Sequence, residues 1–169
     1  MNLENAVVTV TVGGKVQEKF MVNLPNIRSL KGFLQGAWDL SVYNDCFPKK
    51  NRLGDVDGSV EIFGHTLHVE FKVSRYSLNR GQVLKAIRQA EKSNISTIFI
   101  FGKTNQPVGY TFITPQNLQA DYVEADQDSI KQVMKDWAKY AEENNLVENR
   151  SAEWELVRHY FRSETSTTE

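Results

Sequence analysis

Alternation of apolar and polar residues predicts two β-hairpins in the first half of the chain. Alternating stretches flank Gly13-Gly14, a pair that favours a tight two-residue turn, so an N-terminal hairpin is expected over residues 6–22. A second pair of alternating stretches, 57–63 and 66–74, flanks Gly64-His65. Apolar residues recur at helical spacing in four other segments, which we expect to be helices: 28–43, 80–93, 127–143 and 152–162.

Two further strands complete the predicted pattern. Ile95–Phe101 is almost wholly apolar and rich in β-branched residues, which is typical of a central buried strand, and another strand is expected over Pro107–Ile113. This order of elements favours an α/β or α+β fold with a mixed sheet flanked by helices. We expect one domain over residues 1–169, with a C-terminal helix and polar tail at 152–169 and with all three tryptophans, Trp38, Trp137 and Trp154, in the core.

Composition excludes several classes of protein. The 169 residues are 40% hydrophobic and 24% charged, which is ordinary for a globular chain and unlike a largely disordered one. The single cysteine, Cys46, cannot form an internal disulfide, and no Cys/His cluster suggests a zinc site. No stretch approaches the ~20 apolar residues that span a bilayer, so no membrane association is expected. The lone cysteine, which cannot form an internal disulfide, predicts a reducing, cytoplasmic environment.

The charges are unevenly distributed along the chain. Residues 26–110 carry 12 basic and 7 acidic residues, whereas residues 111–169 carry 6 basic and 12 acidic ones. A basic middle segment suggests an anionic partner, although a chance distribution of surface charge would look the same. If the partner is a phosphate backbone, the candidate contacts are basic residues of one loop and one predicted helix: Lys49, Lys50, Arg52, Lys85, Arg88 and Lys92.

The predicted hairpin at 57–72 gathers the polar residues with the clearest chemistry. If Gly64-His65 forms the turn, Asp57 faces Lys72, Ser59 faces Glu70, and Glu61 faces His68. Strand alternation then places these polar side chains on one face of the hairpin and the large apolar ones on the other.

Two carboxylates beside a lysine suit metal-dependent hydrolysis. Asp57 and Glu70 would supply the oxygen ligands that Mg²⁺ prefers, and Lys72 would orient a water or neutralise the developing charge. Glu61 as an extra ligand and His68 as a proton shuttle are further candidates on the same face. The alternative is an exposed amphipathic strand that carries cross-strand ion pairs.

The spacing of Asp57 and Glu70-Phe71-Lys72 resembles the motif of the PD-(D/E)XK nuclease superfamily, particularly its RecB-like and phage-encoded members. The turn glycine Gly64 and Gln82 near the start of the next predicted helix extend the resemblance, which covers about residues 28–143. It implies a restriction-endonuclease-like fold and a metal site formed by Asp57, Glu70 and the backbone carbonyl of Phe71. Lys72 and Gln82 would act on the attacking water or the substrate.

The resemblance implies a Mg²⁺-dependent nuclease, with Mn²⁺ as a substitute metal and nucleic acid, expected to be DNA, as the substrate. A phage-encoded protein would act in the host cytoplasm. Asp55 competes with Asp57 for the metal role, because alternation places both residues on the polar face; strand phase favours Asp57. Many members carry a Glu on the helix before the motif, and segment 28–43 contains none. This departure keeps open an alternative, a non-catalytic nuclease-fold protein that binds nucleic acid or a protein partner as a phage accessory or anti-defence factor. The oligomeric state stays open, with a homodimer among the alternatives.

Overall fold

The computed structural model of the chain describes residues 3–24, 29, 31–32, 36, 39–49, 51–52 and 54–162. The chain divides into two units, Met1–Asp55 and Val56–Glu169, and each is described by itself. The prediction of a single domain over 1–169, with its nuclease-like core at about 28–143, stays a prediction. The polar tail from residue 163 onward lies outside the described residues.

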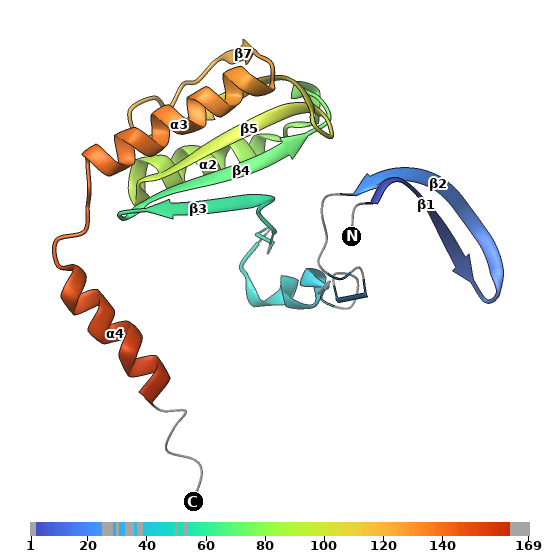
Figure 1. The fold of residues 1–169 in the computed structure, drawn as a ribbon, viewed down its shortest axis with the longest axis horizontal. Coiled ribbons are helices and arrows are strands. Elements are labelled where there is room, and N and C mark those ends of the chain that lie inside the picture. The colour runs from blue at the N-terminus through green and yellow to red at the C-terminus, as the bar shows by residue number, and fades with distance from the viewer. Residues whose placement is uncertain are drawn as a thin grey trace, which may run out of the picture. The chain divides into compact units, whose positions relative to one another are not determined.

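The first unit contains the predicted N-terminal hairpin. Strands β1 (Leu3–Val12) and β2 (Lys15–Leu24) pair in antiparallel fashion around Gly13-Gly14, whose φ angles of 57° and 80° suit glycine (Figure 1). Residues 28, 30, 33–35 and 37–38 of the predicted helix at 28–43 lie outside the described residues. Its last four positions, 40–43, belong to a 3₁₀ helix, η1 (Leu40–Cys46), which begins after Asp39. The Asp39 carboxylate accepts a hydrogen bond from the backbone N–H of Ser41.

The second unit is built on a five-stranded mixed sheet with the order β3-β4-β5-β6-β7 (Figure 1). The strands span Gly58–Ile62, His65–Lys72, Ile95–Lys103, Gln106–Ile113 and Tyr122–Glu124. Only the β4–β5 pair of this sheet is parallel, and helix α2 (Arg80–Ser93) connects its two strands. The predicted mixed α+β class is therefore confirmed.

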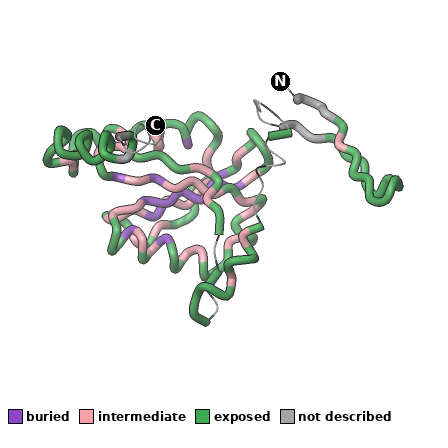
Figure 2. Tube along the Cα trace, turned by 90° about the horizontal axis from the view of Figure 1, so that it is seen from below, coloured by how far each residue is buried: buried purple, intermediate pink, exposed green. Residues whose placement is uncertain are grey.

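Helices cover both faces of this sheet, and the central strand β5 is therefore buried on both sides. Ile98 and Ile100 pack toward helix α3 (Gln127–Glu143), whereas Phe99 and Phe101 pack toward α2. Figure 2 shows the buried positions gathered along the central strands. On α3, Trp137 is 6% exposed and lies in the core, as predicted.

The β3–β4 turn differs from the predicted one. Phe63 and Gly64 form it, with φ angles of 47° and 89°, and both positive values are those of a type I′ turn. The prediction that Gly64-His65 forms the turn is wrong because His65 begins β4 as a buried residue. Its Nε2 lies 2.8 Å from the carbonyl oxygen of Asn144, and its Nδ1 lies 3.1 Å from Nδ2 of Asn94.

The new turn shifts the pairing of the two strands by two residues. Val60 pairs with Leu67 and Gly58 with Val69, instead of the predicted Val69 and Phe71. A shift of two positions leaves every side chain on its predicted face. Continuing this register by one pair brings Asp57 opposite Glu70, whereas the sequence predicted Lys72.

Two predictions about apolar residues are also wrong. Helical spacing in 80–93 predicts that Val83, Leu84, Ile87 and Ala90 face inward. Leu84 of α2 is instead 46% exposed, since Ala86 and Ala90 take the positions against the sheet. Trp154 is 61% exposed on helix α4 (Arg150–Arg162), which presents several other exposed apolar side chains. Among the helices that the structure describes, none has the length and apolar character needed to cross a bilayer.

Candidate functional site

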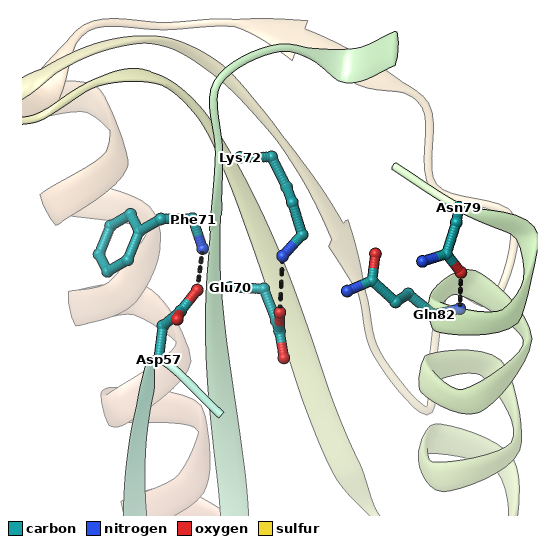
Figure 3. A network of polar contacts seen from close by, with 6 residues as sticks. All are labelled: Asp57, Glu70, Phe71, Lys72, Asn79 and Gln82. Atoms are coloured by element: carbon teal, nitrogen blue, oxygen red, sulfur yellow. Dashed lines mark hydrogen bonds and ion pairs between the residues drawn. The ribbon is translucent and has the colours of Figure 1, made fainter. Parts of the chain in front are cut away.

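Asp57 lies immediately before β3, where the hairpin pairing begins. Its Oδ2 accepts a hydrogen bond of 2.7 Å from the backbone N–H of Phe71 in β4 (Figure 3). This bond holds one oxygen of the carboxylate at the carboxyl-terminal half of β4, beside Glu70. The resemblance implied a role for the carbonyl of Phe71, and the contact that the structure shows here is made by its amide.

Glu70 and Lys72 form an ion pair along β4. Alternation places the two residues on the same face of the strand, and Lys72 Nζ lies 2.9 Å from Glu70 Oε2. Their side chains are only 15% and 16% exposed. In the parallel ladder they pair with Phe99 and Phe101 of β5, the core residues beneath α2. The pair is therefore partly buried at the edge of the α2 core, and it is not the exposed cross-strand pair of the alternative interpretation.

Gln82 extends the site from the neighbouring helix. It lies in the first turn of α2, and its side-chain amide points toward the Glu70–Lys72 pair (Figure 3). Within the described part of the chain, its Oε1 is buried and has no hydrogen-bond partner. A buried oxygen without a donor is costly, so this atom suits a water or substrate donor placed between β4 and α2.

Asn79 fixes the position of Gln82 and was missed by the sequence analysis. It is the N-cap of α2, and its Oδ1 accepts a hydrogen bond of 2.9 Å from the backbone N–H of Gln82. An asparagine directly before an apolar helical pattern is a recognised N-cap signal, so the sequence did contain this information.

Replacing Asn79 by alanine is expected to lower the free energy of unfolding by about 1 kcal/mol, because the first turn of α2 loses its cap. Asn79→Ser is the matched control, since a serine hydroxyl accepts the same bond. Urea unfolding of the three proteins measures the effect. Equal stability of Asn79→Ala and the wild type would show that the cap contributes nothing.

His68 and Glu61, the secondary candidates, lie in different environments. Partial burial lowers the pKa of His68, the charge of nearby Lys85 lowers it further, and Glu70 opposes the shift. A neutral imidazole is thereby favoured on the same strand face as Glu70 and Lys72. Glu61 is used elsewhere, because its carboxylate accepts a hydrogen bond from the backbone N–H of Gly64 and so stabilises the turn.

The predicted phosphate contacts fall into two groups. Lys85, Arg88 and Lys92 are exposed on α2, in the same unit as the carboxylates. Lys49 and Arg52 are exposed in the first unit, and Lys50 lies outside the described residues.

The site offers a metal ion a small set of oxygen donors. No group of three or more His, Cys, Asp or Glu side chains converges anywhere in the described part of the chain. Mg²⁺ usually takes one or two carboxylates and completes its shell with water, so Asp57 and Glu70 meet its minimum requirement. The Lys72 ammonium on Glu70 Oε2 would compete with the cation for that oxygen.

Comparison of the chain with protein-family models, with curated proteins and with solved structures gave no match. The functional assignment therefore rests on the arrangement of Asp57, Glu70, Lys72 and Gln82.

Proposed function

We propose that this chain is a Mg²⁺-dependent nuclease of the PD-(D/E)XK type that hydrolyses phosphodiester bonds, with DNA as its expected substrate. One observation carries the proposal: Asp57, Glu70 and Lys72 gather on the β3–β4 hairpin beside the orphan oxygen of Gln82. A mixed sheet with helices on both faces and a parallel β4–α2–β5 unit is compatible with the restriction-endonuclease-like fold.

Each residue has a defined role in this proposal. Asp57 and Glu70 would hold the metal, which when bound supplies Lewis acidity and a water of lowered pKa. Lys72 would donate hydrogen bonds to the attacking water and place a positive charge near the phosphorane, where negative charge develops. Gln82 Oε1 would accept a hydrogen bond from that water and so orient it. Lys85 and Arg88 would bind flanking phosphates.

Lys72 would exchange partners when metal and substrate bind. In the structure its ammonium compensates the charge of Glu70. With Glu70 holding a divalent cation, Lys72 would no longer pair with that carboxylate, and its ammonium would bind the water or a phosphate oxygen. The same ion pair also favours the second candidate function, a non-catalytic nuclease-fold protein in which Lys72 permanently neutralises Glu70.

Asp57→Asn and Glu70→Gln are each expected to weaken Mn²⁺ binding more than ~10-fold. Loss of a residue that only hydrogen-bonds to a metal ligand already costs ~10-fold. The larger effect is expected because each replacement removes one of the two charged oxygen donors. Isothermal titration calorimetry of the full chain with Mn²⁺ measures the affinities.

Glu61→Gln is the matched control for the calorimetry. Glu61 lies on β3, which pairs with the β4 strand of Glu70, and a glutamine oxygen can still accept the hydrogen bond from the backbone N–H of Gly64. We expect this variant to bind Mn²⁺ like the wild type. If both Asp57→Asn and Glu70→Gln bind Mn²⁺ with wild-type affinity, the metal site lies elsewhere in the chain.

A further inference from the structure

Near the carboxylates, a set of aromatic and cationic side chains in mutual contact extends from the sheet core to the protein surface. Phe101 of β5 pairs with Lys72, and its ring lies 5.8 Å from the ring of Tyr122 on β7. The guanidinium of Arg75 lies over the ring of Tyr122, at 5.6 Å, and over the ring of Tyr76, at 5.0 Å. These contacts place Arg75 and the two tyrosines close to the Lys72 end of the candidate site.

The inner part of this set is held in place. The hydroxyl of Tyr122 donates a hydrogen bond of 3.0 Å to the carbonyl of Val108. Gly109 leaves room for the ring, because a Cβ at this position would lie 2.4 Å from the Tyr122 hydroxyl oxygen. Tyr122 is thus anchored on β6 and provides a fixed base for Arg75.

The outer part is open to solvent. Tyr76 belongs to the short 3₁₀ helix η2 (Arg75–Ser77) and is 83% exposed. Its hydroxyl accepts a hydrogen bond of 2.9 Å from Arg75 Nη2, which orients the ring. Because most of the ring surface faces solvent, the ring is available for a ligand.

The charge of this segment identifies the class of ligand. Residues 73–80, which join Lys72 to the start of α2, include Arg75 and Arg80 and no acidic residue. An exposed aromatic ring beside arginine is the arrangement that binds single-stranded nucleic acid, because bases stack on the ring and phosphates bind the cation. Bases within a duplex are already stacked on one another and cannot reach such a ring.

We infer that Tyr76, supported by Arg75 and Tyr122, is a base-stacking subsite for single-stranded nucleic acid next to the candidate metal site. The inference rests on the proposed function for its assignment of nucleic acid as the ligand. It adds a substrate class: single strands, or the unpaired ends and flaps of duplexes, are held beside Lys72 through an unstacked base.

The test is the affinity of the full chain for a fluorescein-labelled single-stranded oligonucleotide and for a duplex of the same sequence, by fluorescence anisotropy. Ca²⁺ replaces Mg²⁺ so that binding is measured without turnover. Tyr76→Ala is expected to weaken single-strand binding by about ten-fold or more, the effect of losing one stacked base. Tyr76→Phe keeps the π-face and should bind within about three-fold of the wild type.

Phe161→Ala is the control for loss of an exposed aromatic ring, since Phe161 is 65% exposed on α4. It should leave single-strand affinity unchanged. The inference is overturned if Tyr76→Ala binds the single strand like the wild type, if it weakens duplex binding equally, or if the wild type binds neither probe. Tyr76-dependent binding by a chain that cleaves nothing would support the subsite and reject the nuclease, so the two claims fail separately.

Discussion

Lys72→Met is expected to reduce nucleic-acid cleavage by a factor of about 100 to 1,000, the usual cost of losing one charge-stabilising donor in a transition state. Methionine is preferable to alanine because it keeps the volume of a side chain that is only 16% exposed. The initial rate of DNA cleavage in Mg²⁺ measures the effect. Lys131→Met on α3 is the matched control, since Lys131 is 56% exposed and pairs only with exposed Asp128 among the described residues.

The same variant is expected to bind Mn²⁺ at least as tightly as the wild type. Removal of the ammonium frees Glu70 Oε2 and abolishes repulsion between the lysine and the bound cation. Loss of cleavage with retained metal binding would separate the role of Lys72 from those of the carboxylates. Cleavage by Lys72→Met at the wild-type rate would contradict the assignment.

Trp137→Ala is expected to lower the free energy of unfolding by about 3–5 kcal/mol, because it removes a large side chain from the α3 face of the core. Trp137 is 6% exposed, and its Nε1 donates a hydrogen bond of 3.2 Å to the buried hydroxyl of Ser96. Denaturant unfolding followed by circular dichroism measures the change.

Trp154→Ala is the control, because it makes the same Trp-to-Ala replacement at a position that is 61% exposed. Its effect should stay within about 0.5 kcal/mol, as for most surface substitutions. Equal destabilisation by the two substitutions would show that Trp154 is also packed in the core, as the sequence analysis had expected.

Local sequence signals predicted the elements that have strong periodicity. The helices at 80–93 and 127–143 have the predicted bounds, because their apolar residues recur at regular helical spacing. Strand β7 was missed, since three exposed residues carry no period.

The hairpin register depended on contacts that no local pattern contains. Phe63-Gly64 and Gly64-His65 are both plausible two-residue turns. Asn94 and Asn144, distant in sequence, bind the two ring nitrogens of His65 and hold it inside β4. Asp57 nevertheless stays on the face predicted for Glu70 and Lys72, because a shift of two residues does not change alternation.

Burial of the site was also beyond the sequence analysis. The parallel pairing of β4 with β5 places Glu70 and Lys72 beside Phe99 and Phe101, under the edge of α2. Without knowledge of that pairing, the polar face of the hairpin resembles any solvated strand. The stacking set formed by Arg75, Tyr76 and Tyr122 was missed for the same reason, since β7 brings Tyr122 to Arg75 from far along the chain.

Incubation of the purified full chain with plasmid, linear duplex and single-stranded DNA, in Mg²⁺, in Mn²⁺ and in EDTA, shows whether the chain is a metal-dependent nuclease. We expect cleavage of at least one substrate with either metal, no cleavage in EDTA, and recovery when Mg²⁺ is added back, because the carboxylates act only through the cation. Cleavage that persists in EDTA, or intact substrates at every metal concentration in a chain that binds Mn²⁺, would contradict the proposed function.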